Sequence, residues 1–74
     1  MPAQLATLLL QLANGGRSVR GISHDALARM LGTYRETVSS ILRTFKSEGM
    51  VNLGYRRIDL RDVRSLAEAA EVVD

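Results

Sequence analysis

Residues 22–39, ISHDALARMLGTYRETVS, decide the fold of this chain. Ser23 is a good N-cap for a short helix, because its hydroxyl can accept a hydrogen bond from a free backbone N–H of the first turn. Gly32 ends that helix, since glycine readily takes the left-handed conformation at a helix end. Thr33, with Glu36 three residues later, forms a capping-box pattern that opens a second helix. Two short helices joined by a tight turn predict a helix-turn-helix.

Apolar residues give each of these two helices one buried face. The first helix spans about residues 24–31. Its predicted buried positions are Leu27, Met30 and Leu31. The second helix ends near Gly49, and its apolar residues recur at i, i+3, i+4 and i+7. These residues are Val38, Ile41, Leu42 and Phe45. Tyr34 falls on the same apolar side at about 100° per residue, which predicts that it packs or lies at an edge.

A third amphipathic helix precedes this unit. It spans about residues 3–13, and the turn sequence Asn14-Gly15-Gly16 ends it. Its predicted apolar stripe consists of Leu5, Leu8, Leu9 and Leu12. Residues 17–22 are too short and too interrupted by glycine for a helix, so we expect a short strand or an extended link there.

A hairpin and a last helix follow the two central helices. Residues 50–53 and 57–60 alternate with period two around Gly54-Tyr55-Arg56, which predicts a β-hairpin. Asp62 can cap a helix over about residues 63–72. Its apolar positions are Val63, Leu66 and Ala70. We therefore predict a mainly α fold with a small β-hairpin, a winged helix-turn-helix in a single domain. The expected bounds are 1–74 for the domain, about 23–48 for the helix-turn-helix and about 50–60 for the wing.

Size and composition exclude several classes of protein. The 74 residues allow one hydrophobic core, and no apolar run approaches the ~20 residues of a membrane span. The absence of cysteine excludes disulfides and cysteine-based metal sites, and no carboxylates cluster to complete a site with the single histidine. We expect no metal and no cofactor in this chain. Because no nucleophile, base and orienting group can be named together, we do not expect an enzyme.

The net charge of +2 conceals an asymmetric distribution. Residues 1–57 hold eight basic and three acidic side chains, a balance of +5. Residues 58–74 hold two basic and five acidic side chains, a balance of −3. A basic excess in the first three quarters of the chain is typical of a partner rich in phosphate, although a solvated surface has the same pattern.

The exposed face of the second central helix has the side-chain chemistry that double-stranded DNA requires. Arginine donates two hydrogen bonds to guanine, glutamate accepts from cytosine, and serine contacts bases or phosphates. The predicted base contacts are Arg35, Glu36, Ser39 and Ser40. The predicted contacts to the DNA backbone are Thr37, Arg43, Lys46, Tyr55, Arg56 and Arg57. We expect the acidic last helix to point away from the DNA.

Several of these residues have a second interpretation. Glu36 can instead bond back to the N–H of Thr33, as the capping box requires. His24 is either a surface residue or a phosphate ligand, and Arg17 and Arg20 are equally open. The rival function is a winged helix that binds another protein or dimerises without specific DNA binding. Exposed apolar surface on the first helix, where Leu10 lies off the main stripe, would favour that alternative.

The quoted stretch resembles the DNA-binding domain of the catabolite activator/FNR (Crp/Fnr) family of bacterial transcription regulators. The family hallmark is a turn glycine, a small residue and then Arg-Glu-Thr-Val-Ser-Arg on the recognition helix, and this chain has Arg35-Glu36-Thr37-Val38-Ser39. Later residues continue the similarity, which extends over roughly residues 5–70. They are Leu42, Phe45, Gly49, Val51 and the strand Arg57-Ile58-Asp59-Leu60.

The resemblance implies a cytoplasmic, sequence-specific regulator that works as a homodimer on palindromic DNA and contacts RNA polymerase. Arg35 and Glu36 correspond to base-contacting residues of the family. Ser40 stands where many members carry a second such arginine, and Tyr34 where serine or threonine is common, so neither the usual half-site nor the usual phosphate contact is assumed. Family members also carry an N-terminal sensor barrel and a long dimerisation helix. We expect an excised C-terminal domain without these regions, or a stand-alone relic, and these residues assign no effector.

Overall fold

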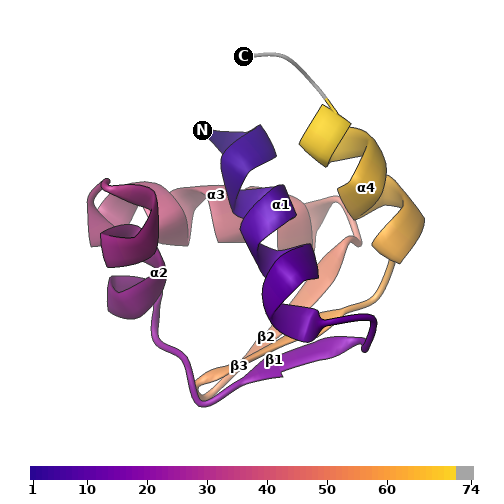
Figure 1. Ribbon diagram of the computed structural model, residues 1–74, viewed down its shortest axis with the longest axis horizontal. Helices are drawn as coiled ribbons and strands as arrows, with labels where there is room; N and C mark the ends of the chain where they lie inside the picture. The colour runs from indigo at the N-terminus through magenta and orange to yellow at the C-terminus, as the bar shows by residue number, and fades with distance from the viewer. Residues whose placement is uncertain (72–74) are drawn as a thin grey trace.

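Four helices and a three-stranded antiparallel sheet make up residues 1–71, the part of the chain that the computed structural model describes (Figure 1). In chain order the elements are α1 (Pro2–Ala13), β1 (Ser18–Arg20), α2 (His24–Leu31), α3 (Arg35–Ser47), β2 (Val51–Gly54), β3 (Arg57–Leu60) and α4 (Val63–Glu71). The predicted helices and hairpin are confirmed, and the open segment 17–22 contains a short strand. Residue 72 of the predicted last helix lies outside the described residues.

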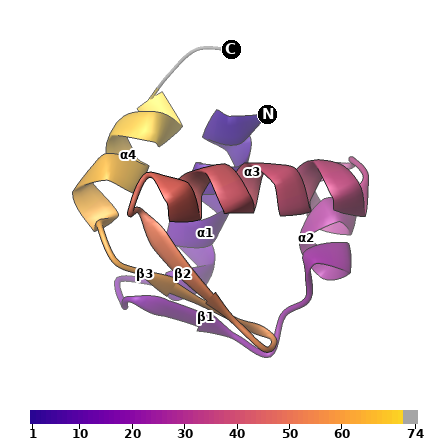
Figure 2. The same cartoon turned by 180° about the vertical axis from the view of Figure 1, so that it is seen from behind.

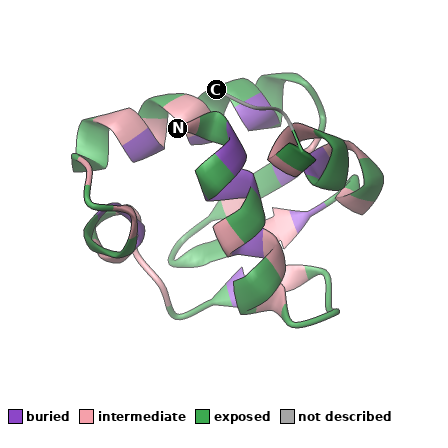
Figure 3. Ribbon diagram, turned by 45° about the horizontal axis from the view of Figure 1, so that its top comes forward, coloured by how far each residue is buried: buried purple, intermediate pink, exposed green. Residues whose placement is uncertain are grey.

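The sheet has the order β1-β3-β2, so the hairpin gains a third strand from the segment before α2. Val19 pairs with Ile58, and Leu53 pairs with Ile58 from the other side. Val19 and Ile58 are buried because this face of the sheet is covered by the helices (Figure 3). The largest fully buried side chains are Leu5, Leu9, Leu27, Val38, Leu42, Val51, Ile58, Leu60 and Leu66. One core thus joins every helix to the sheet.

Alanines shift the buried faces of α1 and α2 away from the predicted positions. In α1, Ala6 is fully buried while Leu12 is 37% exposed, contrary to the predicted leucine stripe. In α2, Ala28 is buried while Met30 is 56% exposed, so the prediction that Met30 is buried is wrong. A small residue lets two elements approach closely, and each helix therefore turns toward its alanine. Counting only large apolar residues misses this rotation.

The turn between α2 and α3 differs from the predicted capping box. Gly32 has a φ of 71°, and the N–H of Thr33 donates to the carbonyl of Ala28 at 2.9 Å. Because that N–H is already used, Glu36 cannot accept from it as the capping box requires. The N-cap of α3 is Tyr34, which makes no capping hydrogen bond through its side chain.

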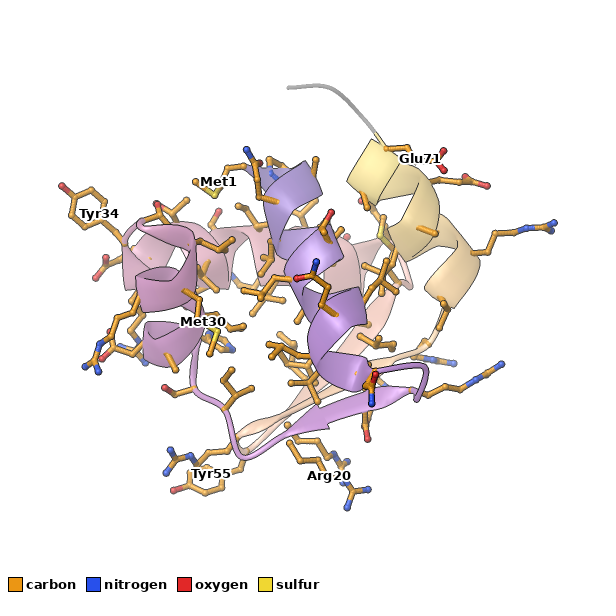
Figure 4. The ribbon with its side chains drawn as sticks, viewed as in Figure 1. Met1, Arg20, Met30, Tyr34, Tyr55 and Glu71 are labelled. Atoms are coloured by element: carbon orange, nitrogen blue, oxygen red, sulfur yellow. The ribbon has the colours of Figure 1, made fainter. Side chains whose placement is uncertain are left out.

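The predicted packing of Tyr34 is also wrong. Its backbone is extended, with φ −95° and ψ 149°, so the helical periodicity that placed it on the apolar side does not apply to it. The ring is 77% exposed and projects from the corner between α2 and α3 (Figure 4).

Two cap predictions are confirmed and one is refined. The Ser23 Oγ accepts from the N–H of Ala26 at 3.1 Å, and an Asp62 carboxylate oxygen accepts from the N–H of Ser65 at 3.0 Å. At the end of α1 the cap itself is Asn14, in the left-handed conformation with φ 49°. Among residues 1–71, no helix is long and apolar enough to cross a membrane.

Candidate nucleic-acid interface

The polar face of α3 lies open to solvent along the whole helix, which crosses the molecule in Figure 2. On the opposite face Val38, Leu42 and Phe45 are buried and fix the rotation of the helix. That rotation leaves seven charged or polar side chains exposed: Arg35, Glu36, Ser40, Arg43, Thr44, Lys46 and Ser47. Thr37 and Ser39 are half-buried at the edges of this face.

The charges on this face have no ionic partner within residues 1–71. The two ion pairs among these residues join Asp25 to Arg29 and Arg57 to Asp59, each at 3.3 Å. Glu36 does not bond back to Thr33, whose N–H already donates to Ala28. The structural alternative for Glu36 is therefore wrong, and its carboxylate is free to accept hydrogen bonds from a ligand.

Ser39 is tied to the neighbouring helix. Its Oγ lies 2.8 Å from the Nδ1 of His24, the first residue of α2. Both residues are half-buried where the two helices meet. A hydroxyl has one donor and two acceptor positions, so this bond leaves Ser39 able to make a second one. The link between His24 and Ser39 was not predicted, because periodicity places a residue on a helix face without naming its partner on another helix.

The wing ends in a two-residue turn, Tyr55-Arg56, between the paired residues Gly54 and Arg57. Tyr55 is 92% exposed, and Arg56 has a φ of 49°. The carbonyl of Arg56 accepts from the N–H of Gly21 at 2.8 Å. The tip of the wing is thereby fastened to the link that leads from β1 into α2.

The sequence left the roles of Arg17 and Arg20 open, and the structure places these residues at opposite ends of β1. Arg20 lies directly opposite Arg57 in the β1–β3 register, at the same end of the sheet as Tyr55 (Figure 4). Arg57 pairs with Asp59 at 3.3 Å, whereas no ion pair among the described residues involves Arg20. Arg17 precedes the other end of β1, where its carbonyl accepts from the N–H of Leu60.

A groove of about 220 Å³ joins the wing to the start of both central helices. We call it the α2–wing groove, and it is lined by residues 22–24, Arg35 and residues 54–58. The three arginines that line it are Arg35, Arg56 and Arg57. Burial, and then the nearby charge of Arg35, hold the pKa of His24 below its usual value. The groove is therefore electropositive and contains a neutral imidazole near pH 7.

Most of the predicted site residues thus fall into two adjoining groups. Arg35 belongs to both, since it begins α3 and also lines the groove. Arg43 and Lys46 continue along the helix, with Lys46 about 16 Å from Arg35 at 1.5 Å per residue. The acidic helix α4 lies at the other end of α3 from α2 (Figure 2).

Helix α1 exposes only a little of the apolar surface that would have favoured a protein-binding module, at Leu12, which is 37% exposed. Leu10 is half-buried and packs against the core. An apolar hollow of about 330 Å³ does lie between the start of α1, the inner side of α3 and α4, lined in part by Ala3, Phe45 and Ala69. No group of three or more His, Asp or Glu side chains in residues 1–71 could hold a metal ion.

The tight α2–turn–α3 unit, the polar outer face of α3 and the following hairpin define a winged helix-turn-helix protein. The family model described as the Crp-like helix-turn-helix domain matches residues 3–69. This chain belongs to that family, which confirms the resemblance seen in the sequence.

Two curated relatives and one solved structure show the extent of the similarity. The transcriptional regulator SdrP of Thermus thermophilus is 35% identical over 75 aligned residues, which cover 92% of this chain and 37% of SdrP. The cyclic AMP receptor protein of the same species is 40% identical over 63 residues, covering 85% of this chain and 29% of that protein. The solved structure of a CRP/FNR-family transcriptional regulator, also from Thermus thermophilus, superposes with a TM-score of 0.89 at 31% identity, over 97% of this chain and 41% of the other. This chain spans about a third of the length of these proteins.

Proposed function

We propose that this chain is the sequence-specific DNA-binding module of a Crp/Fnr-like transcription regulator, with α3 in the major groove. The observation that carries the proposal is the polar face of α3, which is exposed along its length and has no ionic partner among residues 1–71. A major groove about 12 Å wide admits one α-helix. The similarity to transcription regulators supports the same assignment.

The base contacts in this proposal are Arg35, Glu36, Ser39 and Ser40. Arg35 can donate two hydrogen bonds to the O6 and N7 of guanine, and Glu36 can accept from the amino group of cytosine. Ser40 is exposed near the middle of α3, where a hydroxyl can donate to or accept from a base edge.

The contacts to the sugar–phosphate backbone surround that face. They are Thr37, Arg43, Lys46, Tyr55, Arg56 and Arg57, to which we add Arg20. Arg20 is included because it lies opposite Arg57 at the wing end of the sheet and has no ionic partner among residues 1–71, so its charge is available to a phosphate. Arg17 is left out because it lies at the other end of β1.

We further propose that the module, with its helix-turn-helix at about 23–48 and its wing at about 50–60, works in a homodimer in the cytoplasm. The greater length of the relatives is consistent with a longer regulator that supplies the dimer contact. One module offers few phosphate contacts and no avidity, so a single copy binds weakly. A dimer binds both half-sites of a palindrome at once, so the contacts of two modules contribute to its affinity.

Titrating salt against duplex binding tests the proposal. We expect binding at low salt, measured by fluorescence anisotropy of a labelled duplex, and a steep loss of affinity between about 50 and 200 mM salt. Lys46→Ala should lower the slope of log K against log salt by about 1. Arg64→Ala, on the exposed side of α4, is the matched control and should leave the slope unchanged. A folded chain that fails to bind at low salt, or binds without salt dependence, would contradict the proposal.

A further inference from the structure

We propose that His24 is a positioning residue that decides whether Ser39 offers DNA a hydrogen-bond donor or an acceptor. The inference rests on the proposed function and extends it to a residue outside the exposed face of α3. It starts from the 2.8 Å contact between the His24 Nδ1 and the Ser39 Oγ, which is the one side-chain hydrogen bond between α2 and α3 in the described part of the chain.

The surroundings of His24 keep its imidazole neutral near pH 7. The charged side chains around its groove are Arg35 on α3 and Arg56 and Arg57 at the wing, with Asp59 pairing Arg57 and Asp25 pairing Arg29. The phenol of Tyr55 lies beside them. The imidazole also sits at the positive N-terminal end of α2, which disfavours a further positive charge. These causes agree with the lowered pKa of His24.

A neutral imidazole has one N–H and one lone pair, so the bond to Ser39 leaves a choice of tautomer. The α2–wing groove faces phosphate in the proposed complex, and phosphate accepts hydrogen bonds. The matching form therefore carries its proton on Nε2 and its lone pair on Nδ1. In that form Ser39 donates its only proton to His24, and its oxygen can only accept from DNA, as from the amino group of cytosine or adenine.

Protonation of His24 reverses this arrangement. Both ring nitrogens of an imidazolium are donors, so Nδ1–H now donates to the Ser39 Oγ. The hydroxyl proton of Ser39 is then free to reach an acceptor such as the O6 of guanine or the O4 of thymine. The added charge also lies among the phosphates of bound DNA, so binding favours the protonated ring and takes up a proton.

The test compares DNA affinity across about pH 5.5 to 7.5 for wild type, His24→Asn and Ser39→Ala, on duplexes that differ at one base pair. Affinity of wild type should rise as the pH falls, by no more than tenfold per pH unit because one proton is taken up, and its preferred base should change. His24→Asn keeps an amide that can bond to Ser39 and does not titrate, so its affinity and base preference should not depend on pH in this way. Ser39→Ala should keep the pH dependence of affinity and lose the change in base preference.

Two results would overturn the role of His24. One is a pH profile of His24→Asn that parallels that of wild type, because another group would then be titrating. The other is an Nδ1–H tautomer of the neutral ring in the DNA-bound chain, measured by the imidazole nitrogen chemical shifts in NMR. Either result would leave salt-dependent DNA binding intact, whereas a wild-type chain that binds no duplex at any pH would overturn the proposed function as well.

Discussion

At Arg56 the left-handed backbone conformation favours glycine, whereas the proposed phosphate contact requires arginine. A φ of 49° lies in the left-handed region, where a residue other than glycine, asparagine or aspartate is uncommon. Such a conformation costs of order 1–3 kcal/mol and persists most often at functional positions. An arginine held there at the tip of the wing, beside the exposed ring of Tyr55, is consistent with selection for a phosphate contact.

Replacing Arg56 by glycine should separate these two effects. We expect Arg56→Gly to leave the chain as stable or more stable toward urea, because glycine adopts this conformation without the side-chain clash. Duplex affinity should fall at low salt, because one phosphate contact is lost. A variant that binds as well as wild type would show that the arginine serves the turn alone.

Arg35 and Lys46 should respond differently to truncation, since one is proposed to contact a base and the other a phosphate. Arg35→Ala should cost about 1–3 kcal/mol on its preferred sequence and remove the preference at one base pair. Lys46→Ala should weaken every duplex by a similar factor. Affinities on a panel of single-base-pair variants distinguish the two, and an equal loss on all sequences for Arg35→Ala would argue against a base contact.

At the scale of elements, caps and turns decide where each helix begins. The caps of α2 and α4 could be predicted from Ser23 and Asp62, because each needs only a short-range hydrogen bond. The capping box at Thr33 failed, because the N-cap of α3 is Tyr34 and the N–H of Thr33 already donates to Ala28. Sequence pattern shows that a residue can cap a helix, and a competing backbone bond decides whether it does.

Replacing Gly32 would measure how much the left-handed conformation at the end of α2 depends on glycine. Its φ of 71° suits glycine, and a Cβ added there would meet no atom within 4 Å. Gly32→Ala should therefore lower the free energy of unfolding by about 1–2 kcal/mol through backbone strain alone. Gly54→Ala is the matched control, since its Cβ would be in ordinary contact, 3.5 Å from the Arg57 side chain, and its φ is not positive. Equal effects in urea unfolding would contradict this explanation.

Acid should weaken α4 through its cap. Hydrogen bonds from the backbone and then the side chain of Ser65 lower the pKa of Asp62 below its usual 3.8. A lowered pKa in the folded state stabilises the fold above about pH 4, and this stabilisation is lost as the pH falls through the folded value. Wild type should therefore have a higher Tm than Asp62→Asn near neutral pH, and the difference should shrink below pH 4. A constant difference across the whole range would rule out the carboxylate as the cause.

At the scale of the whole molecule, the site combines segments that are distant in the sequence. The face of α3 was predictable, because Val38, Leu42 and Phe45 fix its rotation and Arg35 and Arg43 follow from that. The α2–wing groove was not, because its formation depends on β1 pairing with β3 and on the bond from Gly21 to Arg56. Neither contact leaves a periodic pattern in the sequence.

The wrong prediction that Met30 is buried also arises because contacts between different elements decide the outcome. Met30 was assigned to the core by its size and spacing, whereas the adjoining helices approach on the side of Ala28. Local periodicity finds the apolar side of a helix to within about one residue. The exact side is chosen by the neighbour that packs against it, which the sequence of a single helix does not specify.

Selection of bound sequences from a random duplex pool tests sequence-specific DNA binding most directly. The chain would be fused to a dimerising coiled coil, because one module alone binds weakly. We predict enrichment of an inverted repeat whose half-sites lie about one helical turn, or about 10 base pairs, apart. A pool that remains random, although the fusion is folded and binds DNA, would contradict sequence-specific recognition by α3.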